Sequence, residues 1–248
     1  SVLGSEDVID AVKTQSLYAF TLRNNPVDLT LWKYLWNSSG TGALSPDSSL
    51  SFTYSFNLNG TEYYQHMRGC RPTSGTLSVS RGMWDQTMTF ICKDITVPAT
   101  STGDGGTPVY QSAETSSSPI VHSDGGGSPF TYNSISYGER SFSTTVNRNM
   151  AVMAVNGETD ITYTKATDRA ITFSADVFSG TASSETALYT LYESKDADAA
   201  TYKFNSSGPV TLTYANCVIT DYAYTHAAGS ADALIESITC RAESCTNL

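Results

Sequence analysis

Runs in which apolar and polar residues alternate with a period of two constrain the fold of this chain more than any other feature. Successive side chains of a β-strand point to opposite faces of the sheet, so this period is typical of half-buried antiparallel strands. In the second half the runs are 142–146, 171–173, 176–178, 210–214 and 217–224, and strand-like runs in the first half are 50–56, 62–67, 76–80 and 87–92. Composition agrees, because 34 Ser, 33 Thr and 15 Tyr among 248 residues favour sheets over helices. We therefore predict a mainly β protein.

Two segments break this alternation and predict one short helix in each half of the chain. Asn25-Pro26 opens the first helix, and a Ser-capped segment over 183–193 forms the second. The candidate core anchors of these helices are Trp32, Trp36, Leu188 and Tyr192. Apolar and aromatic side chains at helical spacing usually fasten a helix to its sheet, although aromatic pairs also mark carbohydrate-binding faces.

The order of helix and strands is repeated in the two halves. Aligning 32–38 with 188–194 brings Cys70 near Cys217 and Cys92 near Cys240, with spacings of 22 and 23 positions. This match favours the duplication of a helix-plus-sheet module, and chance similarity between two β-rich halves is the alternative. The first module then spans 1–99, a Ser/Thr/Gly-rich loop or linker spans 100–128, and the second module spans 129–248.

The first module has no clear counterpart of the strands at 130–178 before its helix. Either residues 1–24 and the 100–128 loop supply those strands, or the first module is trimmed.

The second half has an opening strand at 130–133, the segment 137–149, a meander ending at 170–178, a short helix and a closing hairpin. In this order of elements it resembles the tail tube proteins of long-tailed, siphovirus-like viruses of bacteria and archaea. The first half resembles the closing part of the same module at 74–82 and 88–95. The resemblance implies two β-sandwich or open-barrel tube modules, each with a short packed helix. It also implies a virion protein that is made in the host cytoplasm.

The resemblance further implies that the subunits assemble into rings. Their sheets join edge to edge into one continuous β-barrel of about 24 strands, and the rings stack into a tube through which double-stranded DNA passes without specific binding. The implied partners are other copies of the chain and other tail proteins. If each module supplies about four strands, three two-module chains complete a pseudo-sixfold ring, so a homotrimer is favoured and a homohexamer is the alternative.

The chain is acidic, with a formal net charge of −10 and a pI near 4.6, and its Lys and Arg residues do not cluster. Proteins that grip phosphate backbones use clustered cations, so this composition argues against tight binding of nucleic acid. A tube lumen that presents carboxylates would instead repel DNA and let it slide. The candidate lumen acids, on or beside the closing hairpins, are Asp85, Asp221, Asp232 and Glu236.

The five cysteines allow either disulfides or neighbouring thiols. Residues 217–224 and 234–241 predict a hairpin whose register opposes Cys217 to Cys240 and Asp221 to Glu236. Two carboxylates opposite each other are costly on a dry face, so either the hairpin is bulged there or that part faces water in the lumen. The analogous pairing of Cys70 with Cys92 would set Leu77 opposite Asp85, so side-chain parity does not support it. Five buried, unpaired thiols are the alternative, because virions assemble in a reducing cell.

Catalytic and metal-binding motifs are missing from the sequence. There is no GxSxG, HExxH, P-loop or CxxC pattern, and three scattered histidines form no ligand pair at helical spacing. No window reaches about 18 consecutive apolar residues, as a membrane-spanning helix requires. We expect no enzyme activity, metal, cofactor or membrane span. The alternative function is a secreted or surface β-sandwich module that binds a glycan or a protein.

Overall fold

The computed structural model describes residues 17–26, 29–36, 49–80, 83–96, 129–153, 163–178, 187–203, 211–226 and 234–247. The strands of the first half are β1 (Tyr18–Asn24), β2 (Leu50–Leu58), β3 (Thr61–Ser80), β4 (Met83–Cys92) and β5 (Asp94–Ile95). Those of the second half are β6 (Phe130–Tyr132), β7 (Ile135–Met153), β8 (Tyr163–Phe178), β9 (Asp198–Lys203), β10 (Thr211–His226), β11 (Leu234–Ala242) and β12 (Ser244–Asn247). The helices are η1 (Thr30–Trp32), α1 (Lys33–Trp36) and α2 (Ala187–Ser194). The prediction of a mainly β protein is confirmed.

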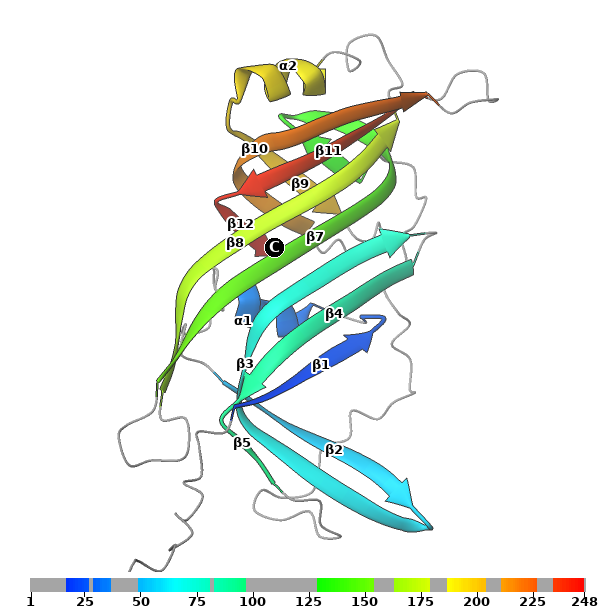
Figure 1. The fold of residues 1–248 in the computed structure, drawn as a ribbon. Helices are drawn as coiled ribbons and strands as arrows, with labels where there is room; N and C mark the ends of the chain where they lie inside the picture. The colour runs from blue at the N-terminus through cyan, green and yellow to red at the C-terminus, as the bar shows by residue number, and fades with distance from the viewer. Residues whose placement is uncertain are drawn as a thin grey trace, which may run out of the picture.

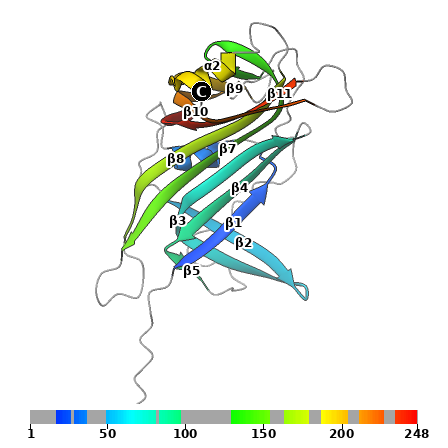
Figure 2. The same ribbon diagram turned by 45° about the horizontal axis from the view of Figure 1, so that its top comes forward.

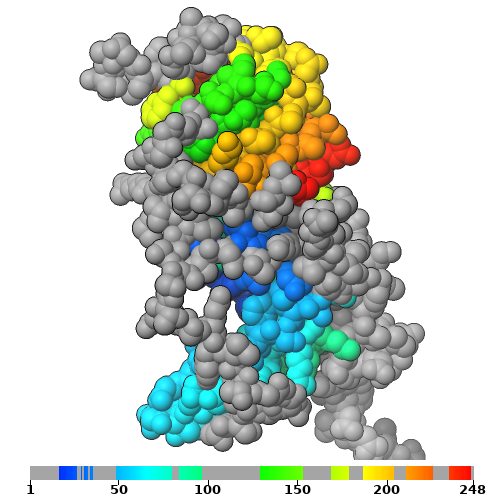
Figure 3. Space-filling model, turned by 180° about the vertical axis from the view of Figure 1, so that it is seen from behind, coloured from blue at the N-terminus to red at the C-terminus, as the bar shows by residue number. Residues whose placement is uncertain are grey.

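One continuous antiparallel sheet joins both halves of the chain (Figures 1 and 2). Its strand order is β1-β4-β3-β7-β8-β11-β10, and we call it the main sheet. The joint between the halves is the pairing of β3 with β7, which runs from Ser74 opposite Asn147 to Val79 opposite Phe142. The first half lies at one end of the molecule and the second half at the other (Figure 3).

The second half closes on itself behind the main sheet. β6 pairs with β7 and β9, and β9 pairs with β10, so that β7, β6, β9, β10, β11 and β8 form a closed circle of strands. Aromatic rings fill its interior: Phe142 stacks on Tyr202 with 4.1 Å between ring centroids, and Phe173 lies 4.7 Å from Tyr214. These large apolar side chains supply the burial that stabilises the circle.

Helix α1 packs over the joint between the two halves. Trp32, directly before α1, and Leu35 are fully buried, and a Cβ atom added at Gly75 of β3 would lie 2.5 Å from Leu35 Cδ1. Glycine at position 75 therefore permits the close approach of helix and strand. On the β7 side, Arg148 Nη1 donates a hydrogen bond of 2.6 Å to the carbonyl oxygen of Tyr34. Trp36 ends α1, and its side chain lies outside the described residues.

Helix α2 packs on β10 at the far end of the main sheet. Leu188 is fully buried, and Tyr192 is partly buried with its ring stacked at 5.9 Å on Tyr222. Lys195, which follows the helix, places its Nζ atom 3.5 Å from the centroid of the Tyr192 ring. Tyr189 and Tyr224 remain 46% and 64% exposed. This end of the core is therefore only partly covered.

Strands β3 and β10 make the same series of pairings. β3 pairs with β2 and β5 in its first part and with β4 in its second, and β10 pairs likewise with β9 and β12 and then with β11. Each strand has a residue of positive φ where it passes from one set of partners to the other, Gly69 at 60° and Asn216 at 51°. The two long strands thus turn at corresponding points of the chain.

Each of these strands also carries a β-bulge three residues after a cysteine. The bulged residues are Thr73, after Cys70, and Thr220, after Cys217. Thr73 Oγ1 donates a hydrogen bond of 3.2 Å to the Thr89 carbonyl, and Thr220 Oγ1 donates one of 3.0 Å to the Thr239 carbonyl.

Candidate lining and assembly surfaces

The two faces of the main sheet differ in chemistry. Side chains alternate along each strand between the core and the opposite face, which we call the polar face. In β4, for example, Trp84 and Gln86 are buried, whereas Asp85 and Thr87 are partly exposed. Figure 1 is viewed onto the polar face, with α1 and β9 behind the sheet.

Two rows of side chains cross the polar face from strand to strand. The serine row, paired across six adjacent strands, is Asp85, Ser78, Ser143, Ser174, Thr239 and Asp221. The threonine row, paired in the same way, is Arg23, Thr87, Thr76, Thr145, Thr172 and Arg241. Each row is a run of hydroxyl side chains with a charged residue at either end. The two rows together carry two carboxylates and two guanidinium groups, and so are close to neutral.

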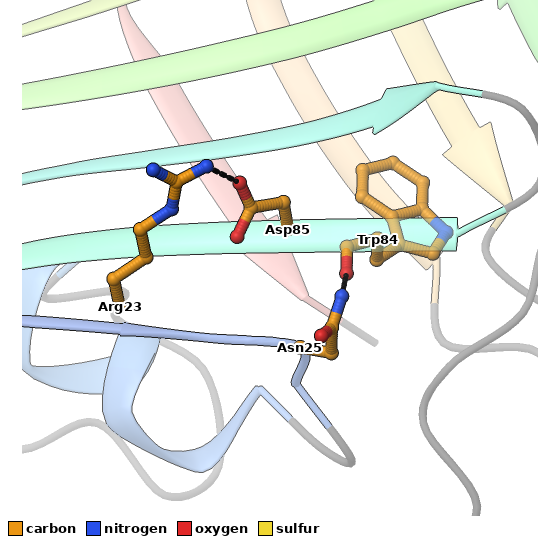
Figure 4. A network of polar contacts seen from close by, with 4 residues as sticks. All are labelled: Arg23, Asn25, Trp84 and Asp85. Atoms are coloured by element: carbon orange, nitrogen blue, oxygen red, sulfur yellow. Dashed lines mark hydrogen bonds and ion pairs between the residues drawn. The ribbon is translucent and has the colours of Figure 1, made fainter.

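Polar contacts link side chains within this face. The hydroxyls of Thr76 and Thr145 are 3.2 Å apart across the joint between the halves. Arg23 Nη2 lies 2.9 Å from Asp85 Oδ2 and connects one end of the threonine row to one end of the serine row (Figure 4). The Arg23 and Asp85 side chains are 74% and 40% exposed, so this ion pair contributes little to stability. The ion pair does keep the guanidinium group of Arg23 bound to a carboxylate.

Asp176 of β8 is a further carboxylate on the polar face, and sequence reasoning missed it. It accepts hydrogen bonds from Ser141 of β7 at 2.8 Å and from Ser237 of β11 at 2.6 Å. The alternation of Asp176 with Ala175 and Val177, both buried in the core, is the signal that would have found it.

The structure separates the four candidate lumen acids. Asp85 and Asp221 lie on the polar face, at the two ends of the serine row. Glu236 lies on the core face, where it is 1% exposed and accepts a hydrogen bond of 3.1 Å from the Tyr222 hydroxyl. Its predicted pairing with Asp221 is wrong, because Glu236 lies opposite Tyr224. Glu236 is in step with Ile238 and Cys240 along β11, and all three are buried. The hairpin is bulged at Thr220, which was one of the two alternatives, and the bulge turns Asp221 to the polar face. Asp232 lies outside the described residues.

All five cysteines are buried thiols that form no disulfide. Cys70 and Cys92 are neighbours whose thiols share a hydrogen bond. This hydrogen bond, together with burial, raises the pKa of Cys70. Cys240 pairs with Ile219 rather than with Cys217, two positions from the predicted register, and Cys217 pairs with Asp198 of β9. Burial, with a smaller contribution from the charge of Asp198, raises the pKa of Cys217 to about 12.

The main sheet ends in two strands with open edges. Within the described part of the chain, no strand pairs with β1 on the side away from β4. Likewise, beyond Cys217 no described strand pairs with β10 on the side away from β11. An open sheet edge presents backbone donors and acceptors that another strand can pair with, so both edges are candidate assembly surfaces.

A second candidate assembly surface is the hairpin of β2 with the first part of β3, residues 50–68, which we call the projecting hairpin. It extends away from the rest of the first half (Figures 1 and 3). Tyr54 and Leu58 are 57% and 55% exposed on it, and the ring of Phe56 stacks at 5.7 Å on both Tyr54 and Tyr63. Exposed aromatic side chains on a projecting element are typical of a contact surface.

Two kinds of site are absent from the part of the chain that the structure covers. No group of three or more His, Cys, Asp or Glu side chains there could hold a metal ion. No helix among the described residues is long and apolar enough to cross a membrane.

The described residues thus define a mainly β protein built on a two-sided antiparallel sheet with a hydroxyl-rich face and open edges. The chain belongs to the phage tail tube protein family, whose sequence model matches residues 8–242. It is therefore a structural component of a virion tail. A search of curated protein sequences gives no match. Among solved structures, Hcp1 from Flavobacterium johnsoniae is similar over 48% of this chain and 91% of its own, with 14% identity and a TM-score of 0.31.

Proposed function

We propose that this protein forms rings whose inner wall is the main sheet, with the polar face turned to the lumen and double-stranded DNA passing through without being held. The observation that carries this proposal is the pair of hydroxyl rows that cross the sheet. The opposite face is covered by α1, by α2 and by the closed circle of strands, so the polar face is the one available to a channel.

A hydroxyl-lined wall suits a passage for DNA. Affinity for the phosphate backbone comes mainly from cations that displace condensed counterions. In the two rows the cations are Arg23 and Arg241, and Arg23 is already paired with Asp85. We therefore propose a low-charge lumen with Asp85, Asp176 and Asp221 as its carboxylates, in place of the strongly acidic lumen that composition suggested. Such a wall offers DNA hydrogen-bonding groups but no array of charges to hold it.

We also propose that the chain contains two related tube modules, 1–99 and 129–248, joined by the 100–128 segment. The matching pairings of β3 and β10 and the matching bulges at Thr73 and Thr220 support this duplication. A ring of three copies follows from two modules per chain, and a ring of six copies is the alternative.

We further propose that rings stack through the projecting hairpin and through the 100–128 loop, which lies outside the described residues. Deleting 103–126 is expected to leave folded subunits and rings that stack poorly. Unchanged tubes would show that the loop is only a linker.

Electron microscopy of the purified chain tests the proposed function. We expect tubes or stacked rings with a central hole, and these tubes associate with other tail proteins in the virion. A monodisperse monomer that is retained on a glycan column would instead favour a secreted or surface binding module.

Charge substitutions test whether the polar face lines the lumen. The double variant Ser143→Lys and Ser174→Lys adds cations to the serine row and is expected to make assembled tubes retain DNA at low salt. The control Thr190→Lys adds a cation to the exposed face of α2 and should not. Equal DNA retention by the two variants would contradict the assignment of the polar face to the lumen.

A further inference from the structure

The strand directions of the main sheet create a mismatch at the contact between two copies. All neighbouring strands in the order β1-β4-β3-β7-β8-β11-β10 are antiparallel, so β1 and β10, the first and last, run in the same direction. Rotational symmetry preserves strand direction along the ring axis. If rings form as proposed above, direct pairing of β10 with β1 of the next copy would be parallel, in a sheet that is otherwise antiparallel. One more strand between them, antiparallel to both, removes the mismatch.

The joint inside the chain indicates which strand is missing. β3, the counterpart of β10, pairs with β7, and β7 pairs in turn with β8, which follows it in the chain. β8 corresponds to β1, because β8 pairs with β11 as β1 pairs with β4. The strand that would correspond to β7 therefore directly precedes β1 in the chain.

The partly covered end of the core, beside α2, indicates that the same strand is missing. At the internal joint, Trp32 and Leu35 pack on Gly75 of β3, while Arg148 of β7 binds the carbonyl of Tyr34, so that the helix region spans both strands. α2 packs on β10, and Tyr189 of α2 remains 46% exposed. A strand placed along the outer edge of β10 would extend the surface under α2 as β7 does under α1.

We propose that residues 1–16 supply this strand on assembly, lying between β1 of their own chain and β10 of the neighbouring copy. The internal joint pairs β3 residues 74–79 with β7 residues 142–147, and a segment of 16 residues is long enough for such a strand and a tight turn. The segment includes Val8-Ile9 and Ala11-Val12, and β-branched residues favour strands. The family match begins at residue 8 and so already includes part of this segment.

Deletion of residues 1–16 tests the inference. Because the described core is formed by residues from Tyr18 onward, we expect the deleted chain to keep the far-ultraviolet circular dichroism of the full chain but to form fewer than a tenth as many rings. A synthetic peptide of residues 1–16 should restore rings when added in trans, whereas a scrambled peptide of the same composition should not. Normal rings from the deleted chain would overturn the inference while leaving the proposed function intact.

Hydrogen exchange on the full chain gives a second measurement that does not depend on the folding of a deletion variant. In assembled tubes, amides within 8–16 and along 221–226 are both expected to exchange more slowly than in the free subunit. Protection of 18–24 and 221–226 without protection of 8–16 would indicate direct pairing of β1 with β10 and would overturn the inference. If the full chain forms no rings under any condition, the proposed function fails first and this inference fails with it.

Discussion

Replacing Gly75 by alanine tests whether α1 holds the two halves together as the structure indicates. The added Cβ would lie 2.5 Å from Leu35 Cδ1 and 3.1 Å from Trp32 Cη2. Both residues are fully buried, so neither side chain can move aside without disturbing the core. Overpacking of this kind costs about 1–3 kcal/mol, and the lower entropy of the unfolded alanine chain offsets about 0.4–1 kcal/mol. The expected net loss in the free energy of unfolding is about 1–2 kcal/mol.

Urea unfolding of Gly75→Ala against Gly138→Ala measures this loss with a matched control. Gly138 lies in β7, and a Cβ there would meet only Phe178, at 3.7 Å, an ordinary contact. Its replacement should therefore change stability by less than about 0.5 kcal/mol.

A double-mutant cycle with Leu35→Ala identifies the residue responsible. Leu35→Ala alone should cost about 2–5 kcal/mol, and the double variant should be more stable than the sum of the two single losses predicts, because the alanine at 75 then has room. Equal stability of the Gly75 and Gly138 variants, or strict additivity in the cycle, would refute the packing argument.

Other substitutions have expected effects that separate packing from charge. Trp32→Ala should lower the free energy of unfolding by about 3–5 kcal/mol in urea titrations, because Trp32 is fully buried and donates a 2.9 Å hydrogen bond to Gln86. Arg23→Ala should leave the free energy of unfolding almost unchanged in the same assay, since its ion pair is exposed. A loss as large as that of Trp32→Ala would contradict that assignment. Burial raises the pKa of Glu139 to about 7, so its folded form favours the proton. Stability should therefore fall as pH rises from about 4.5 to 7, by at most about 3 kcal/mol, because the group is partly exposed. Glu139→Gln should flatten this dependence in thermal unfolding at several pH values, and an unchanged slope would contradict it.

Period-two alternation predicted the sheet well wherever one face is buried. In β8 the alternation of Ile171, Phe173 and Val177 with polar residues matches the buried pattern along the strand. β1 was not predicted as a defined strand, and residues 1–24 were only one alternative source of the missing strands, although Tyr18, Phe20 and Leu22 alternate with other residues in the same way. A strand this short, next to a helix signal, is easily overlooked.

The full register could not be predicted, because bulges have weak sequence signals. The opposed carboxylates made a bulge near Asp221 one of two alternatives, but nothing indicated the one at Thr73. The extra residue at Thr73 moves Leu77 from opposite Asp85 to opposite Gln86, which restores the parity that the unbulged pairing lacks. The extra residue at Thr220 turns Asp221 to the polar face, whereas Glu236, in step with the buried Ile238 and Cys240 along β11, stays on the core face. A one-residue slip reverses the face of every later side chain. The hydroxyl rows depend on this register and were therefore invisible in the sequence, although the high Ser and Thr content that forms them was plain.

A cross-section of the assembled tube by electron cryomicroscopy tests the central proposal most directly. We expect three copies of the 26.6 kDa chain in each ring, about 80 kDa in total. The main sheets should form the inner wall, with the serine and threonine rows facing the lumen. Six copies per ring would contradict the duplication, and a wall in which these rows face outward would contradict the proposed path of the DNA.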